Sequence, residues 1–243
     1  MTQMKVWKLN HGIEIHQVLS GRSNSYLLIT NEQCILIDTG VNKSFHTLKK
    51  NIEKVNKQHK PISFLILTHT HFDHCQSVNE LKATYNCKVI VSKEAQASIK
   101  NGYTVLPKGT LFFTKIISKL GHIIKSKRIR YKPFCVDIFI EKEYAIRSND
   151  MNLEIIKTDG HSKDSMSIIV NNEIGIVGDT LFGVFSNRVF PPFADDIKKL
   201  IHSWKKLLQT KCNVFLPGHG QEIRRNTLKK ELNKYVKKYS FKF

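Results

Sequence analysis

The sequence predicts a single α/β domain that is built of two halves, each running from strands into helices. Short β-branched runs alternate along the chain with stretches of helical spacing. The second half repeats the order of the first in outline, and no linker or low-complexity segment separates the two. We therefore expect residues 1–243 to form one domain, and this length is ample for a full hydrophobic core.

The overall composition is typical of a soluble globular protein, with 41% hydrophobic and 24% charged residues. Residues 1–21 lack the apolar core of a signal peptide, and no apolar run is long enough to span a bilayer. The five cysteines are scattered without C-x-x-C spacing, which is typical of free thiols in a reducing compartment. We therefore expect a cytoplasmic protein without a transmembrane segment.

The net charge of +19 is the most unusual bulk property of the chain. Such an excess of Lys and Arg can mark binding to nucleic acid, to anionic lipid or to an acidic substrate. It can also reflect a Lys-rich background, since Ile, Asn and Lys abound throughout. We favour the background, and binding to nucleic acid stays open as a second interpretation.

The first half leads to a dense cluster of polar residues. Strand signals predict a β-meander over residues 13–38, a helix over 43–56 and a buried strand over Ile62–Leu67. The strand ends at Thr68–His74, where helical spacing begins and continues to Tyr85, with Asp73 expected as the N-cap. The cluster thus lies on a turn between a strand and a helix, where open α/β sheets place their ligands.

The residue types in this cluster are those of a metal site. Imidazole nitrogen and carboxylate oxygen suit zinc, iron and manganese. Four such groups on so short a loop favour two metal ions that share one site, whereas a surface loop that happens to be rich in histidine is the less favoured alternative. The four expected ligands are His69, His71, Asp73 and His74.

A basic stretch separates the two halves. Residues 103–136 carry eight Lys or Arg and no acidic residue. Apolar residues from Phe113 to Ile124 fall at helical spacing within this stretch, which predicts an amphipathic helix. Such a helix can touch a membrane surface or an anionic partner, but packing on the protein's own core is the favoured interpretation. In either case the stretch is a candidate lid or wall of a substrate pocket.

The second half again alternates strands with helices. It ends in a basic C-terminal helix within residues 222–243, anchored by Leu228, Leu232 and Tyr235. The other expected elements are strands at 136–140 and 153–156, a hairpin over 166–177, an amphipathic helix over 195–209 and a strand over 212–216.

Four further polar residues follow predicted strands, each in a segment that contains glycine. Taken singly, such a residue is usually a turn or capping residue. Together they indicate one site, because strand ends of a two-layered β core converge on one rim. Asp38 is expected to hydrogen-bond a ligand imidazole. The four residues are Asp38, His161, Asp179 and His219.

These motifs resemble, in order and spacing, those of the metallo-β-lactamase superfamily. The matching segments are H-x-H-x-D-H over 69–74, T-x-G-H over 158–161, G-D-T-L-F over 178–182 and P-G-H-G over 217–220. The resemblance implies an α/β fold of four layers, an αββα sandwich, with a dinuclear metal site. It further implies that His69, His71 and His161 hold one metal ion, that Asp73, His74 and His219 hold the second, that Asp179 bridges them, and that Asp38 buttresses the site.

The sequence departs from the superfamily pattern at the rim of the site. Asp159 replaces the usual proline, Ser162 and Asp164 replace a threonine and a glycine, and 75–77 replaces glycines after the fourth ligand. None of these changes removes an expected ligand. Asp159 and Asp164 could add negative charge near the metal ions.

The resemblance implies a hydrolase that uses a metal-activated hydroxide. The closest likeness is to glyoxalase II-like members, which favours a small ester, thioester or lactone as substrate and Asp73 as the catalytic residue that orients the nucleophile. Two zinc ions are the expected cofactors, although iron or manganese fits the same ligands. Only 24 residues follow His219, which is too few for the glutathione-binding region of true glyoxalase II.

Two alternatives stay open. The positive charge favours a phosphodiesterase or nuclease, but the 40 positions between Asp179 and His219 leave no room for the long insertion of the nucleic-acid-processing branch. An iron-dependent oxygenase of the same fold is the second alternative.

Overall fold

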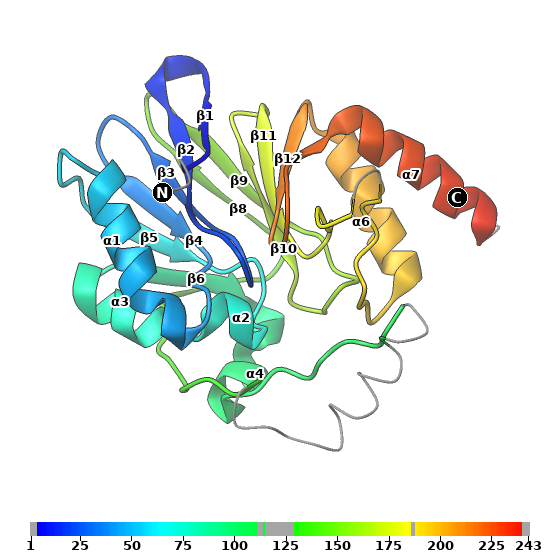
Figure 1. The fold of residues 1–243 in the computed structure, drawn as a ribbon, viewed down its shortest axis with the longest axis horizontal. Helices are drawn as coiled ribbons and strands as arrows, with labels where there is room; N and C mark the ends of the chain where they lie inside the picture. The colour runs from blue at the N-terminus through cyan, green and yellow to red at the C-terminus, as the bar shows by residue number, and fades with distance from the viewer. Residues whose placement is uncertain (1–3, 111–113, 115–128, 186–187, 240–243) are drawn as a thin grey trace.

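The computed structural model describes residues 4–110, 114, 129–185 and 188–239. Two mixed sheets pack face to face, and helices cover the outer face of each sheet (Figure 1). The protein is therefore a four-layered αββα sandwich, as the sequence predicts. Across the described residues, no helix combines the length and the apolar character needed to span a bilayer.

The first sheet has seven strands whose order in space follows their order in the chain. Strands β1 to β4 are antiparallel, and β4 to β7 are parallel. The strands are β1 (Val6–Lys8), β2 (Glu14–Leu19), β3 (Ser25–Ile29), β4 (Cys34–Ile37), β5 (Ile62–Ile66), β6 (Lys88–Ser92) and β7 (Ile138–Ile140).

The second sheet has six strands in the order β13-β12-β11-β10-β9-β8. Its β11 and β12 are parallel, and the other neighbours are antiparallel. The strands are β8 (Glu143–Arg147), β9 (Asn152–Lys157), β10 (Met166–Val170), β11 (Ile174–Gly178), β12 (Val214–Pro217) and β13 (Ile223–Arg224).

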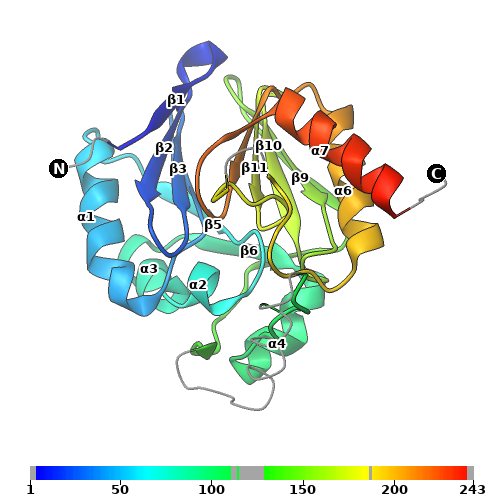
Figure 2. The same cartoon turned by 45° about the vertical axis from the view of Figure 1, so that its right-hand side comes forward.

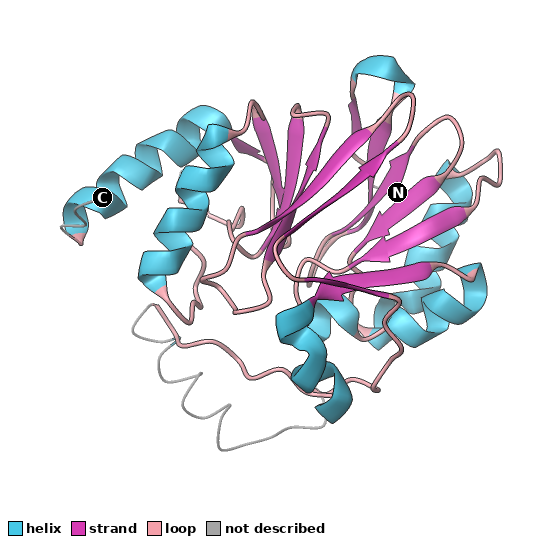
Figure 3. Cartoon of the chain, turned by 180° about the vertical axis from the view of Figure 1, so that it is seen from behind, coloured by secondary structure: helices cyan, strands magenta, loops and turns pink. Residues whose placement is uncertain are grey.

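Helices from the first half cover the first sheet, and two long helices cover the second, as Figures 2 and 3 show from two further sides. The α-helices are α1 (Phe45–Val55), α2 (Phe72–Cys75), α3 (Val78–Tyr85), α4 (Gln96–Asn101), α6 (Ile197–Gln209) and α7 (Arg225–Lys238). Short 3-10 helices occupy Asn10–Gly12, Asn42–Ser44 and Lys93–Ala95.

Three apolar layers hold these elements together. Strands β3 and β4 are buried on both faces, so their alternate residues serve different layers. Leu28 and Ile37 point between the sheets, whereas Leu27 and Leu36 pack under the helices of the first half. A third layer centred on Trp204 joins the second sheet to α6 and α7.

The predicted meander and hairpin are present, as are the helices over 43–56 and 195–209 and the C-terminal helix, but the helix expected from Asp73 to Tyr85 is interrupted. It ends at Cys75 and begins again at Val78. The interruption has a physical cause, because the Ser77 N–H donates to the Thr39 hydroxyl at 3.2 Å instead of to a helix carbonyl. The N-cap position belongs to His71, and Asp73 lies in the first turn of α2.

The predicted amphipathic helix of the basic stretch lies outside the described residues. The flanking segments 103–108 and 131–136, which are described, have no regular secondary structure. They approach the polar cluster through the Thr104 hydroxyl, which lies 2.9 Å from that of Thr70 and 2.7 Å from that of Tyr131. The role of the stretch as a lid stays a prediction.

Candidate metal centre

All seven predicted ligands lie at one end of the sandwich, where β5, β9, β11 and β12 end. Three groups of three are close enough for their ligand atoms to surround one ion, with all the ligand atoms of a group within 4.8 Å of one another. The groups are His69, His71 and His161; His69, His74 and Asp179; and Asp73, His74 and His219.

The first group consists of three buried imidazoles. The His71 Nδ1 and the His161 Nε2 face each other at 3.0 Å. The His69 ring lies against both, with centroid distances of 4.6 Å to His71 and 5.0 Å to His161. The lone pairs of three imidazoles therefore converge, as a first-row metal ion requires.

The group of Asp73, His74 and His219 lies beside the first and is more open. The Nε2 atoms of His74 and His219 are 3.4 Å apart, and the His219 Nε2 is 3.7 Å from a carboxylate oxygen of Asp73. The side chain of Asp73 is 15% exposed, whereas that of His74 is fully buried. Solvent can therefore reach this group from the side of Asp73.

Asp179 lies between the two groups. Its Oδ2 is 3.3 Å from the His219 Nε2 and 3.6 Å from the His161 Nε2. Its Oδ1 is 3.5 Å from the His74 Nε2. One carboxylate thus faces imidazoles of both groups.

The donor set fits metal ions because it contains polar atoms that the described protein leaves unsatisfied. The His69 Nε2 and the Asp179 Oδ1 are buried and have no hydrogen-bond partner among the described residues. Burying such atoms is costly unless a partner compensates for the lost water, and a cation can do so. The centre is also tightly packed around Gly218, because a Cβ at this position would lie 2.3 Å from the Asp179 Oδ1.

Three of the histidines are oriented by the ring nitrogen that points away from the centre. The Asp38 carboxylate accepts from the His74 Nδ1 at 2.8 Å. The backbone carbonyl of Phe193 accepts from the His161 Nδ1 at 2.9 Å, and that of Val105 accepts from the His71 Nε2 at 3.3 Å. These contacts leave the opposite nitrogen of each ring free to hold a metal ion.

Asp38 is itself held in an uncommon backbone conformation, with φ of 59°. Its two carboxylate oxygens accept from the backbone N–H and the hydroxyl of Thr68, each at 2.8 Å. Because Thr68 precedes His69, these bonds fix the start of the ligand loop against the end of β4. Asp38 therefore contacts two parts of the site at once, as expected of a buttressing residue.

Burial keeps the first group neutral. Burial lowers the pKa of His69 well below its usual value and lowers the pKa of His71 in the same direction. Burial also lowers the pKa of His161 to about 4, although the charge of Asp179 opposes this shift. Neutral imidazole is the form that ligates metal, so this group is ready for an ion at pH 7.

In the group of Asp73, His74 and His219, the neighbouring carboxylates favour protonated imidazoles when no metal is bound. Burial disfavours a charged His74, but the carboxylates of Asp179 and Asp38 outweigh it and raise its pKa to about 10. The pKa of His219 is also raised, because Asp179 outweighs burial. Burial would raise the pKa of Asp179, but His219 and His74 hold it well below its usual value. Protons thus compensate a buried carboxylate where a metal cation would do the same.

A family model described as the metallo-beta-lactamase superfamily matches residues 20–219. The chain belongs to this superfamily. The match includes every residue of the centre and both halves of the sandwich. Superfamily members typically bind metal ions, and the groups described above are the candidate ligands here.

Relatives of this protein carry hydrolase names. A probable metallo-hydrolase of Methanocaldococcus jannaschii is 31% identical over 202 residues, which is 82% of this chain and 88% of the relative. A hydroxyacylglutathione hydrolase of Rhodopseudomonas palustris is 23% identical over 140 residues, which is 57% of this chain and 42% of the relative. The chain is accordingly a member of a superfamily of metal-dependent hydrolases.

Solved structures agree with the fold. An archaeal superfamily protein from Sulfolobus tokodaii has a TM-score of 0.66 at 20% identity, covering 94% of this chain and 88% of that one. A subclass B3 metallo-β-lactamase of Bradyrhizobium japonicum has a TM-score of 0.68 at 18% identity, covering 97% of this chain and 92% of that one. At these identities the likeness concerns the fold alone.

The two acidic departures from the superfamily pattern behave differently. Asp164 is buried and accepts from the backbone N–H of Thr70 at 2.8 Å and from its hydroxyl at 2.7 Å. It therefore holds the loop between His69 and His71. Asp159 points to the surface and pairs with Lys199 at 3.1 Å, away from the ligands.

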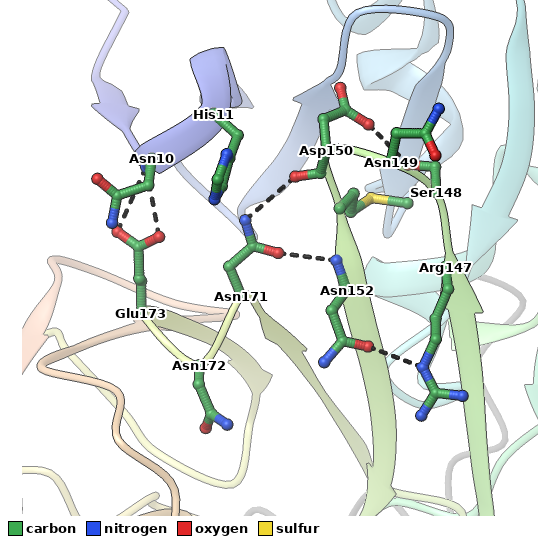
Figure 4. Close-up of a pocket in the computed structure, with 11 residues that line it drawn as sticks. Asn10, His11, Arg147, Ser148, Asn149, Asp150, Asn152, Asn171, Asn172 and Glu173 are labelled. Atoms are coloured by element: carbon green, nitrogen blue, oxygen red, sulfur yellow. Dashed lines mark hydrogen bonds between the residues drawn. The ribbon is translucent and has the colours of Figure 1, made fainter.

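A polar cavity of ≈ 440 Å³ lies at the opposite end of the strands, between the turns that precede β9 and β11 (Figure 4). Its polar side chains mostly bind the turns themselves. Asn171 accepts from the Asn152 N–H at 2.8 Å, and Asp150 accepts from the Ser148 hydroxyl at 2.6 Å. These side chains therefore stabilise the turns, and we assign no catalytic or binding function to the cavity.

Proposed function

We propose that the protein is a metal-dependent hydrolase that cleaves a small ester, thioester or lactone at a centre of two metal ions. The observation that carries this proposal is the position of Asp179 between two sets of imidazoles, with a buried oxygen that has no hydrogen-bond partner among the described residues. A carboxylate in this position can hold two cations at a fixed separation.

Each ligand then has a definite task. The first ion would be held by His69, His71 and His161, and the second by Asp73, His74 and His219, with Asp179 shared. Metal ions bound there supply a water that is deprotonated near neutral pH and polarise the substrate oxygen that gains charge. Zinc is the proposed metal, since imidazole and carboxylate ligands suit it, and iron and manganese fit the same set.

Asp73 is the proposed catalytic residue. Its carboxylate is partly exposed beside His219, so it can orient the attacking water and take its proton. The water oxygen then bonds to the acyl carbon, the bond from that carbon to sulfur or oxygen breaks, and the proton passes to the leaving group. The products are the carboxylic acid, which takes up the water oxygen, and a thiol or alcohol, which takes up the proton.

The rim of the centre supports a small acyl substrate. The Phe182 ring lies 5.1 Å from the His219 ring, and the neighbouring Val184 and Phe185 are 53% and 46% exposed. Val105, whose carbonyl contacts His71, is 55% exposed. Exposed apolar side chains beside reactive groups are typical of a ligand site. The hydroxyacylglutathione hydrolase relatives, which are named for a thioester substrate, support the same class. A small metabolite in the cytoplasm is therefore the proposed partner.

The test combines metal quantification on purified protein with a panel of thioester, lactone and bis-aryl phosphodiester substrates. We expect two metal ions per chain and fastest turnover of a thioester or lactone. Parallel assays on His71→Ala, which lacks a ligand, identify activity from contaminants. Much faster turnover of the phosphodiester would contradict the substrate class, and a single iron with oxygen-dependent turnover would contradict hydrolysis.

A further inference from the structure

A groove of ≈ 1020 Å³ lies beside the loops that follow Asp179 and His219, and its lining includes three lysines. One wall is α1, which packs beside β2, as Figures 1 and 2 show. The other wall consists of Met4 and Lys5, which precede β1, together with the loops that follow Asp179 and His219. The groove is large enough for a nucleotide-sized group.

The groove is joined to the centre through the backbone. Gly220 and Gln221 line it and directly follow His219. Gly183 lines it as well, and its N–H donates to the His219 carbonyl at 2.9 Å. The groove therefore borders the loop that carries His219, and a substrate tail bound in it would lie next to the metal centre.

The floor of the groove is fixed by hydrogen bonds. The Asn24 side chain donates to the carbonyls of Pro217 and Gly220 at 2.9 and 3.0 Å, and it accepts from Gln17 at 2.8 Å. These bonds hold the loop that carries His219 against the turn after β2. The floor is thus preformed, which lowers the entropic cost of binding.

The charge of the groove has one sign. Lys5, Lys50 and Lys54 line it, and no Asp or Glu is among its described lining residues. Lys50 and Lys54 are separated by one turn of α1, an arrangement in which like charges repel. Neither has an acidic partner among the described residues, whereas Lys49 on the same helix pairs with Glu53 at 3.7 Å. Their placement costs stability unless an anion binds between them.

We propose that this groove binds the phosphate-bearing tail of the substrate whose ester or thioester is cleaved at the metal centre. The inference rests on the proposed hydrolase function and adds the chemistry of the leaving group. Ammonium groups bind phosphate as point charges, and three of them match a tail with two or more negative charges. A neutral leaving group would leave all three lysines without a counter-ion from the substrate.

Two thioesters with the same reacting group test the inference. Acetyl-coenzyme A carries a phosphate-bearing tail, and S-acetyl-N-acetylcysteamine has the same thioester without phosphate. We expect the protein to have a higher kcat/KM for the tailed substrate. In Lys50→Gln/Lys54→Gln we expect the ratio of the two kcat/KM values to fall about fivefold to tenfold, as for two partly screened ion contacts.

The control is Lys49→Gln/Lys57→Gln, which removes the same charge from the same end of the fold but outside the groove. It should keep the ratio of the parent protein. A ratio near one in the parent protein, or an equal fall in both double variants, would overturn the groove assignment. So would RNA binding that weakens in the groove variant while the ratio stays unchanged.

The readouts separate this inference from the proposed function. Failure to hydrolyse either thioester at any metal loading counts against the proposed function, whereas hydrolysis of both at equal kcat/KM counts against the groove alone. Adenosine 3′,5′-bisphosphate adds a measurement without turnover. Calorimetry should show that it binds the parent protein and the control variant more tightly than the groove variant, and equal affinity in all three contradicts the inference.

Discussion

At the scale of single residues, the sequence predicts the candidate metal ligands but not all of the groups that accept hydrogen bonds from them. His69, His161 and Asp179 were predicted because each follows a predicted strand and belongs to a motif that resembles those of the superfamily. The carbonyls of Phe193 and Val105, which orient two of the imidazoles, were not predicted. Every residue has a carbonyl, so only the folded path of the backbone shows which one meets a histidine.

Asp179 offers the most direct test of the two-metal proposal. We expect Asp179→Ala to lose at least one metal ion and most activity, because the two sets of imidazoles then lack their shared anion. Metal content per chain and hydrolysis are the measurements. Asp159→Asn, which removes a carboxylate paired with Lys199 at the surface, is the control and should retain both. Full metal content in Asp179→Ala would show that this residue does not bridge the ions.

His161 makes the stability of the metal-free protein depend on pH. Its pKa is about 4 in the folded protein and about 6.5 in an unfolded chain. Between these values the unfolded chain takes up a proton that the folded protein excludes. The free energy of unfolding should therefore decrease as pH falls from about 6.5 to about 4, by at most about 1.4 kcal/mol per pH unit for this histidine.

Urea unfolding of chelator-treated protein between pH 4 and pH 7 measures this dependence. In His161→Asn, the free energy of unfolding should depend less steeply on pH. Part of the dependence should remain, because the pKa values of His69 and His71 are also lowered. His74, with a pKa raised to about 10, is protonated in the folded protein throughout this window. An identical slope in the variant would contradict a neutral buried His161.

At the scale of elements, apolar periodicity decided what the sequence could predict. The predicted helix over 195–209 is present as α6, because its buried face repeats at helical spacing. Strand β8 was not predicted, since most of its residues are exposed and charged or polar, and only pairing with β9 defines it. The break at Ser77 was missed for a similar reason, because a distant threonine causes it.

The start of α6 shows how a local signal supports the site. Asp196 is the N-cap, and its carboxylate accepts from the Lys199 N–H at 3.0 Å, while its own N–H donates to the Gly160 carbonyl at 3.0 Å. We expect Asp196→Ala to reduce the free energy of unfolding by about 1 kcal/mol, because one helix N–H loses its acceptor. Thermal or urea unfolding measures the loss. Asp195→Asn, a neighbouring carboxylate outside the cap, is the comparison, and an equal loss there would contradict the capping role.

At the scale of the whole molecule, strand and helix patterns predicted the halves, and the family resemblance supplied their sandwich packing. Periodicity assigns residues to a buried face but does not say which sheet that face meets. Leu28 and Ile37 share one buried cluster with Leu153 and Ile168, and this cluster depends on the relative position of two separate sheets. The net charge of +19 reflects lysines spread along the whole chain, and three of them come together in the groove beside α1.

Metal removal should affect the whole molecule. A ligand that binds the folded protein alone stabilises it by about 2.7 kcal/mol at a concentration of 100 Kd. We therefore expect chelator treatment to lower Tm by several degrees and re-added Zn²⁺ to restore it. Scanning fluorimetry with and without chelator is the measurement, and His71→Ala should respond less. A Tm that is unaffected by both treatments would contradict metal binding at this centre.

The origin of the ligands has a mechanical consequence. Each of the three ligand groups takes residues from both halves of the chain, as in His69 and His71 with His161. A bound ion would therefore act as a reversible cross-link between the two halves at this end of the sandwich. Separation of the two sheets at that end then requires release of the ion. Amide hydrogens at the ends of β5, β11 and β12 should exchange with solvent more slowly when metal is bound, while those around the Asn171 turn at the far end exchange at unchanged rates.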